Sequence, residues 1–310
     1  MGAGATTACV LGALCPDLDL VRTLQGWDVY LLHHQSGTHS LLGAVGCGVL
    51  TGTVVRAFAR GGRWPALVAA GTVGALSHVF LDLVAGADAR LFAPVWSHSF
   101  SLPLFAMADP WLLSVLVVGA IVCFLGRAAE TARDAGRVLA LIALVIALKS
   151  TLYLRARSIE RQAAGGGTAA THVEAVFGSW TRWTFIEVLP TTLEQWDVDV
   201  GGGAAVRVGS VARRLDAPLA GRSRALPTVA NLLASHEDTF ARVLPGAHGG
   251  DEVRWSALRY CRIAPSRSDP VCGLWFGGEY DARGRATAAV MRVGSLVQRR
   301  SPGRVSPDDE

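Results

Sequence analysis

Long apolar runs alternate with short polar clusters over the first half of the chain. Four of the runs approach the about 20 apolar residues that a helix needs to cross a bilayer, at 41–58, 64–84, 110–125 and 138–154. A shorter run at 3–15 lacks a basic start and a convincing cleavage site, so we interpret it as a short first helix and not as a signal peptide. The pattern predicts an all-α transmembrane bundle of four or five helices over residues 1–154.

The second half of the chain is more polar and has no apolar run of this length. We expect a linker over 155–178 and a small soluble α+β domain over 179–298. The domain is predicted from β-forming residues that alternate or cluster at 194–200, 252–263 and 272–280, and from helical amphipathic periodicity at 227–244. The polar, proline-containing tail at 299–310 is expected to be disordered.

Composition agrees with a membrane protein whose partner is the lipid bilayer. Of 310 residues, 51% are hydrophobic and only 17% are charged, with a mean hydropathy of +0.35. Soluble domains carry about 25% charged residues. The net charge of +4 is an arginine effect, because Lys149 is the only lysine. No basic stretch is interleaved with aromatic residues, so binding of nucleic acid is not expected.

Arginine placement predicts the orientation in an inner (plasma) membrane. If every run crosses, the connections near 56–63 and 127–137 share one face and are richer in arginine than those at 17–40 and 86–109. Arginine-rich connections stay in the cytoplasm. The connections at 17–40 and 86–109 and the C-terminal half are therefore expected on the extracytoplasmic face. Three arginines directly after the last run, at 155–161, argue for the opposite orientation. Cys261 and Cys272 could form a disulfide if their half lies outside the cytosol.

Ionisable residues gather at one face of this expected bundle. They are Asp17 and Asp19 after the first run, His34 and His39 before the second, His78 and Asp82 at the end of the third, and Asp109 at the start of the fourth. His78 and Asp82 are four residues apart, so on a helix they project from the same side. An ionisable group at the edge of an apolar span is costly unless it faces a partner or a cavity.

These residue types are ligands for zinc and similar divalent ions. We predict a divalent-metal site, with zinc as the expected ion, held by Asp17, Asp19, His34, His39, His78 and Asp82. Asp19 or Asp109 could act as a catalytic base, because a bound metal makes water a nucleophile at neutral pH. Each residue also has a structural interpretation: a hydrogen-bonded pair for His78 and Asp82, a turn for Asp17 and Asp19, and a helix N-cap for Asp109. His33 is expected to be a bystander.

Four stretches of the sequence resemble known motifs in both their residues and their order along the chain: GALCPDLD at 12–19, HQSGTHSLLGA at 34–44, LSHVFLDL at 76–83, and LFAPVWSHSFSL with ADP at 91–110. They are similar to the motifs of the YdjM-like family, whose members are described as inner-membrane, metal-dependent hydrolases. The resemblance covers about the first 125 residues. It implies that the six predicted ligands and Asp109 occupy the family's polar positions. Relative to the family pattern, a first helix with a Thr-His pair is expected to be missing, and Gln35-Ser36 replaces Arg-Gly.

Two functions follow from these observations. The first is a membrane-bound metal-dependent hydrolase that cleaves a phosphoester or lipid-like substrate through a metal-activated water. The substrate class is implied by a similarity between these motifs and those of zinc-dependent phospholipase C proteins. The second is a non-catalytic metal-binding sensor or scaffold in the membrane. A transporter is disfavoured, because the ionisable residues gather at one end instead of running through the membrane depth.

Overall fold

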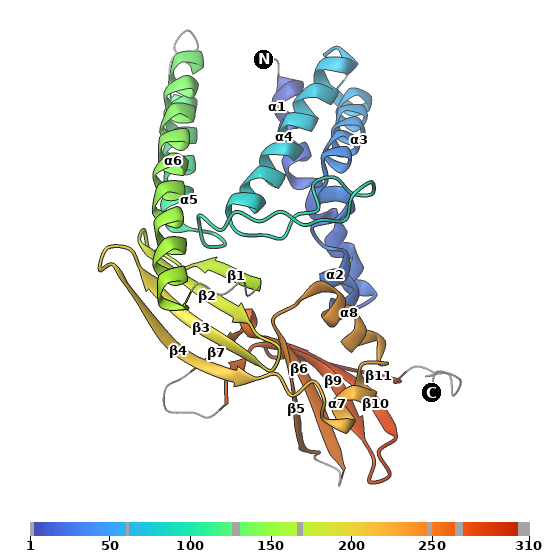
Figure 1. Ribbon diagram of the computed structural model, residues 1–310. Coiled ribbons are helices and arrows are strands. Elements are labelled where there is room, and N and C mark those ends of the chain that lie inside the picture. Colours follow the sequence, from blue (N-terminus) through green and yellow to red (C-terminus); the bar gives the residue numbers. More distant parts are fainter. Residues whose placement is uncertain are drawn as a thin grey trace.

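The chain forms a helical N-terminal part and a β-rich C-terminal part (Figure 1). The computed structural model describes residues 3–59, 62–125, 131–165, 170–246, 250–263 and 269–302. The helical part contains α1 (Ala3–Leu14), η1 (Pro16–Leu24), α2 (Trp27–His33), η2 (Gly37–His39), α3 (Leu41–Ala59), α4 (Trp64–Val84), α5 (Pro110–Leu125) and α6 (Thr131–Ala163). Each of the five apolar runs predicted from the sequence therefore forms a helix.

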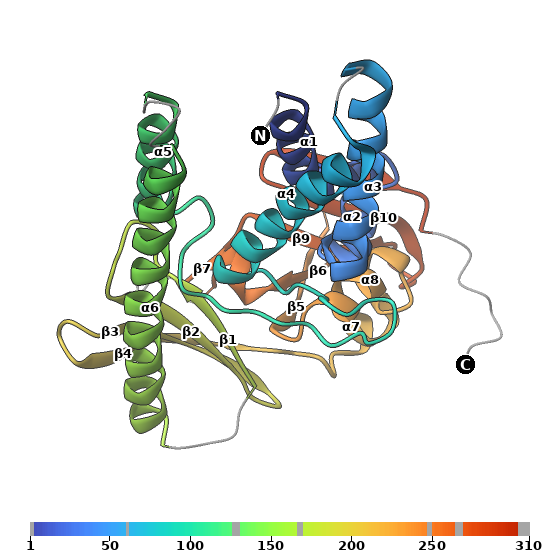
Figure 2. The same ribbon diagram turned by 90° about the horizontal axis from the view of Figure 1, so that it is seen from above.

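Helices α1, α3 and α4 pack together, whereas α5 and α6 form a separate pair (Figures 1 and 2). Small residues let the first group approach closely. A Cβ atom added at Gly12 of α1 would lie 2.1 Å from the carbonyl oxygen of Gly71 in α4, and one at Gly74 would lie 2.0 Å from that of Cys9. Close backbone contact through glycine is typical of helices that associate inside membranes.

Three helices in the described part of the chain are long and apolar enough to cross a membrane: Leu41–Phe58, Trp64–Val84 and Ala132–Ala163. The α1 and η1 helices meet at 44° and would make a fourth span if they form one broken helix. The α5 helix is apolar but shorter. Four or five crossings remain a prediction. The expected last helix, 138–154, was too short, because α6 continues for two more turns into the expected linker.

The described β-rich part contains two large antiparallel sheets and a two-stranded antiparallel pair, β7-β8. The first has the order β1-β2-β3-β4, and the second has the order β11-β10-β9-β6-β5. Its elements are β1 (Ala170–Ala175), β2 (Arg182–Val188), β3 (Thr192–Asp199), β4 (Ala204–Ala212), α7 (Pro218–Ser223), α8 (Pro227–Ser235), β5 (Thr239–Pro245), β6 (Asp251–Ala257), η3 (Leu258–Tyr260), β7 (Cys261–Arg262), β8 (Val271–Cys272), β9 (Leu274–Tyr280), β10 (Ala286–Val293) and β11 (Leu296–Arg300). Helices α7 and α8 pack on the second sheet around the buried Trp255 and Phe276.

Several predicted boundaries in this half were wrong. The amphipathic helix expected at 227–244 ends at Ser235, and residues 239–245 form β5 instead, because pairing with β6 buries Phe240 and Ala241. The linker expected at 155–178 contains the last turns of α6 and all of β1. Strand β11 takes up the first residues of the tail expected at 299–310, and residues 303–310 lie outside the described part. The Cys261–Cys272 disulfide is formed.

Side-chain contacts dock the β-rich part on the helical part. The indole N–H of Trp183 donates to the carbonyl oxygen of Pro103 at 2.8 Å. The guanidinium of Arg259 bridges Asp238 of its own part and Asp88 of the loop after α4, at 2.8 and 2.9 Å. The β-rich part therefore lies against the same end of the bundle that carries η1, η2 and the last turns of α4 (Figure 1).

Candidate metal centre

Three short segments bring the predicted ligands together. Asp17 and Asp19 lie in η1, which begins at Pro16 directly after α1. His39 ends η2, where the hydroxyl of Ser40 donates to the carbonyl oxygen of Gly37 and accepts from the N–H of Gly43, so the turn is fixed against α3. His78 and Asp82 share one side of the last turns of α4.

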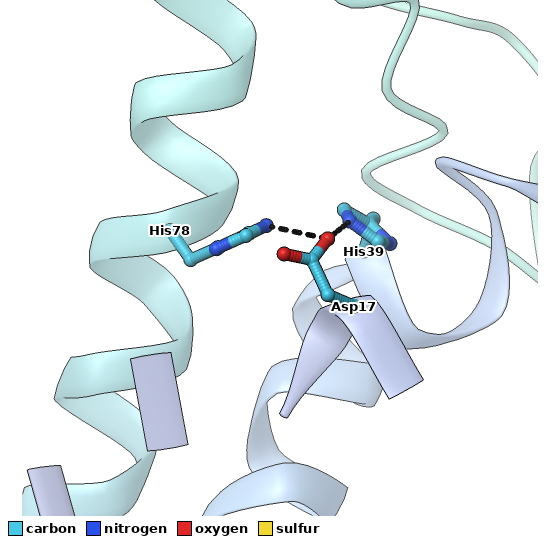
Figure 3. A group of neighbouring side chains, drawn as sticks. All are labelled: Asp17, His39 and His78. Atoms are coloured by element: carbon cyan, nitrogen blue, oxygen red, sulfur yellow. Dashed lines mark ion pairs between the residues drawn. The ribbon is translucent and has the colours of Figure 1, made fainter. Parts of the chain in front are cut away.

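Four donor atoms converge between these segments. The Nε2 atoms of His39 and His78 lie 3.7 and 3.4 Å from Oδ1 of Asp17, and 3.4 and 3.5 Å from Oδ2 of Asp82. Figure 3 shows Asp17 between the two imidazoles. A tetrahedral zinc site with ligand distances of about 2.1 Å has ligand–ligand spacings of about 3.4 Å. These four carboxylate–imidazole spacings are long for direct hydrogen bonds. The triad Asp17–His39–His78 has its donor atoms all within 4.8 Å of one another, a spacing that could hold a divalent ion, and Asp82 lies beside its two imidazoles.

The two imidazole nitrogens in this group lack hydrogen bonds. Among the described residues, Nε2 of His39 and Nε2 of His78 are buried polar atoms without a hydrogen-bond partner. Buried polar atoms are almost always paired, so two orphaned nitrogens that face the same two carboxylates require an explanation. A bound cation provides one, because it would accept the lone pairs of both rings.

A second group of donors lies on the other edge of the His39 ring. Its Nδ1 is 3.5 Å from Oδ2 of Asp19, and the same carboxylate is 3.0 Å from Nδ1 of His34. Both triads, Asp17–His39–His78 and Asp19–His34–His39, have spacings that could hold a metal. They share one imidazole, and a neutral imidazole binds a metal through one nitrogen while the other carries a proton. The two triads are therefore alternatives for a neutral His39.

Burial sets the protonation of the centre. Burial and the neighbouring His34 lower the pKa of His39, so its ring is neutral at pH 7, the form that binds metals. The side chain of His39 is 0% exposed, while that of Asp17 is 56% exposed. The cluster is therefore closed behind His39 and accessible from the side of Asp17.

Tyr30 is a neighbour of the centre that the sequence motifs did not indicate. Its ring stacks on that of His34, with centroids 4.5 Å apart. Burial and the carboxylates of Asp19, Asp17 and Asp82 raise its pKa to about 12, so it remains a protonated donor. Tyr30 and His34 are four residues apart, at the spacing of one helical face, and that spacing was the available signal.

Two residues considered in the sequence lie outside the cluster. Asp109 caps α5: its Oδ1 accepts from the N–H groups of Trp111 and Leu112 at 3.0 and 3.3 Å. A catalytic role for Asp109 stays a prediction, and the contact that the structure gives it is the N-cap. His33 places Nδ1 3.0 Å from the carbonyl oxygen of Val29, away from the carboxylates.

The helical part has a known sequence signature. A family model described as YdjM inner membrane protein matches residues 2–158, slightly more than half of the chain. The chain belongs to the YdjM family. The match spans all of α1–α5 and most of α6, including every residue of the cluster. No curated protein and no solved structure matches the chain. Membership in the YdjM family, together with the apolar helices, identifies an inner membrane protein.

Proposed function

We propose that the chain is a membrane-bound, metal-dependent hydrolase of phosphoesters. The supporting observation is the convergence of four donor atoms with ligand-like spacing, two of them buried nitrogens without hydrogen bonds. When bound, a divalent ion such as zinc would supply Lewis acidity and bring the pKa of water toward neutrality. Two carboxylates and two neutral imidazoles would balance its charge.

Asp17, His39, His78 and Asp82 would hold the ion. This choice, in place of the Asp19 triad, leaves Nδ1 of His39 protonated and facing Asp19. The Thr38 hydroxyl oxygen, 3.2 Å from this nitrogen, accepts its hydrogen bond, and the Asp19 carboxylate, 3.5 Å away, favours the same tautomer electrostatically, as carboxylates behind metal-bound histidines commonly do. Asp19 is thereby assigned to positioning and not to the metal.

His34 is the group proposed to move a proton. Its Nδ1 is hydrogen-bonded to Asp19 at 3.0 Å, and the residue lines the cavity that adjoins the centre. A histidine held by a carboxylate through one nitrogen can take a proton at the other. Tyr30 keeps the ring in place by stacking. In this proposal His34 takes the role of base that the sequence assigned to Asp19 or Asp109.

The proposed orientation places the centre and the β-rich part outside the cytoplasm. The arginine-rich connections support it, and so does the Cys261–Cys272 disulfide, since disulfides persist mainly in oxidising compartments. Residues near Gln35 and near Arg63 lie at opposite ends of the bundle, so labelling of single cysteines at these two places in intact cells would test the orientation.

Metal analysis of the purified full chain tests the proposed centre. We expect about one divalent ion per chain in the wild type and almost none in a His39→Ala, His78→Ala double variant. The matched control is His33→Ala, which removes a nearby imidazole outside the cluster and should keep the ion. Equal, negligible metal in all three proteins would contradict the proposal.

A non-catalytic metal-binding sensor or scaffold is the second candidate, and the exposure of Asp17 alone does not separate it from an enzyme. Hydrolysis of a chromogenic phosphodiester separates them. The hydrolase proposal requires activity in the wild type and in His33→Ala, and loss of activity in the double variant. Metal binding without any such hydrolysis would favour the sensor or scaffold.

A further inference from the structure

A cavity of about 810 Å³ lies between the helical part and the β-rich part. It is lined mainly by residues within 31–35, 85–90, 172–177 and 258–262, and is called here the interdomain chamber. Its volume is in the range of small-molecule sites. His34 belongs to both the chamber wall and the candidate metal centre, so a ligand in the chamber lies next to the centre.

One wall of the chamber offers a cation. The backbone N–H of Arg90 donates to the carbonyl oxygen of Gln35 at 2.9 Å, which holds the Arg90 backbone beside residues 34 and 35. Within the described part of the chain, its guanidinium forms no ion pair with a carboxylate. Arg90 and Gln35 both line the chamber, so the Arg90 guanidinium is available to a ligand there, and guanidinium geometry matches phosphate.

The opposite wall offers hydrogen-bond acceptors. The Ser235 hydroxyl donates to the carbonyl oxygens of Asn231 and Leu232, so it accepts from Nδ1–H of His236, 2.7 Å away. The Tyr260 hydroxyl must then donate a hydrogen bond to Nε2 of His236, 2.9 Å away. The phenolic oxygen of Tyr260 keeps its lone pairs for a ligand.

Glu174 adds a negative charge near this acceptor. Its Oε1 lies 3.2 Å from Nε2 of His172, and its side chain is 47% exposed at the chamber. Burial and the nearby Arg259 lower the pKa of His236 to about 4, so His236 is neutral. Its single ring proton is therefore on Nδ1, which faces Ser235. The wall of the helical part thus offers Arg90, and the wall of the β-rich part offers Glu174 and the Tyr260 oxygen. The β-rich wall also carries Arg259, whose charge is paired with Asp88 and Asp238, and the exposed Arg262.

The mouth of the chamber is apolar. Met107 and Phe177 line it and are 64% and 66% exposed. Both lie near the start of α5, where the indole N–H of Trp111 donates to the carbonyl oxygen of Gly178 at 3.0 Å. Exposed apolar and aromatic side chains at the end of an apolar helix are typical of the membrane interface, where lipid head groups lie.

We propose that the interdomain chamber binds the head group of a zwitterionic phospholipid, a phosphodiester that carries a primary amine. Arg90 contacts the phosphate, and Glu174 and the Tyr260 oxygen accept from the ammonium. Met107 and Phe177 contact the start of the acyl chains. The proposal deepens the proposed function by naming its substrate class, and it rests on that function only for cleavage, not for binding.

Binding of lipids labelled on the acyl chain to the full chain in detergent tests the proposal. The probes are phosphatidylethanolamine and phosphatidylglycerol with the same chains and label. We expect the wild type to bind the ethanolamine lipid at least about fivefold more tightly. Arg90→Gln should weaken both lipids about tenfold, whereas Glu174→Gln should weaken only the ethanolamine lipid and remove the preference. Equal binding of the two lipids by the wild type would overturn the proposal.

Controls separate this proposal from other causes. Arg283→Gln changes an exposed arginine outside the chamber and should leave both affinities unchanged; a loss there equal to that of Arg90→Gln would overturn the site. Glycerophosphoethanolamine, which has the head group without chains, should compete only weakly; competition as strong as that of the lipid would overturn the lipid assignment. The His39→Ala, His78→Ala variant should still bind lipid, so failure of hydrolysis and failure of the chamber are distinguishable.

Discussion

His39 in the helical part and His236 in the β-rich part are both buried, yet their surroundings differ. Both ring nitrogens of His236 lie within hydrogen-bond distance of a hydroxyl, from Ser235 and from Tyr260. His39 likewise has its Nδ1 within hydrogen-bond distance of a hydroxyl, from Thr38, but its Nε2 faces His78 and two carboxylates without a hydrogen bond. Burial alone is thus uninformative about a histidine. An unsatisfied nitrogen opposite carboxylates indicates a ligand, and two satisfied nitrogens indicate a structural role.

The largest expected difference between the two histidines is in metal affinity. His39→Ala removes one of four donors from the closed side of the centre, and we expect zinc affinity to fall by about a thousandfold or more. His236→Ala should leave zinc affinity unchanged. Competition with a chromogenic chelator measures both affinities. A comparable loss of zinc in the two variants would break the comparison.

Asp19→Asn tests the neighbour that orients His39. An amide cannot replace the charge of the carboxylate behind the ring, so zinc affinity should fall about 10- to 100-fold while binding persists. Asp197→Asn, a change at a carboxylate bonded to Thr184 in the β-rich part, serves as the control and should not alter affinity. Complete loss of metal in Asp19→Asn would indicate that Asp19 is itself a ligand.

The stability of the β-rich part should depend on His236 and pH. Its pKa is about 4 in the fold and 6.5 without it, so below pH 6.5 the unfolded chain takes up a proton that the folded chain does not. Stability therefore falls as the pH drops from 6.5 toward 4, by about 2 kcal/mol between pH 7 and pH 5. Thermal unfolding in detergent at both pH values should show a larger fall for the wild type than for His236→Gln. Equal falls would contradict the neutral, satisfied state of His236.

Tyr260→Phe should have the smallest effect. It removes the hydroxyl that donates to Nε2 of His236 and leaves this nitrogen unsatisfied, at a cost of about 1 kcal/mol. A thermal midpoint lowered by a few degrees, with unchanged zinc content, is the expected result. If zinc content also fell, the chamber and the metal centre would be more tightly coupled than their contacts indicate.

The helices and the cluster of candidate ligands could be predicted from the sequence for related physical reasons. The length of an apolar run is enough to predict a helix. Polar residues at the ends of such runs are easy to recognise, because ionisable side chains are rare within apolar spans. Asp17, Asp19, His34, His39 and His78 accordingly form two groups that share His39, and Asp82 contacts His39 and His78. Which of them share one ion could not be predicted, because it depends on which edge of the His39 ring faces which carboxylate.

The β-rich half was less predictable. Residues 227–244 have helical periodicity throughout, but pairing with β6 decides the outcome for the second half of that stretch. The chamber could not be foreseen either, since Arg90 and Tyr260 are 170 residues apart and meet only through the docking of the two parts. Asp109 was expected near the centre from its place in the sequence, but that pattern is equally typical of the helix cap that it forms.

The order of these segments along the chain matters during synthesis. All four proposed ligands come from residues 17–82, so the centre can assemble once the first helices have entered the membrane. The far wall of the chamber, at 258–262, leaves the ribosome almost 180 residues later. A nascent chain thus presents the proposed ligands to metal before its C-terminal half is made, and a truncated product would keep those ligands but lack the far wall of the chamber.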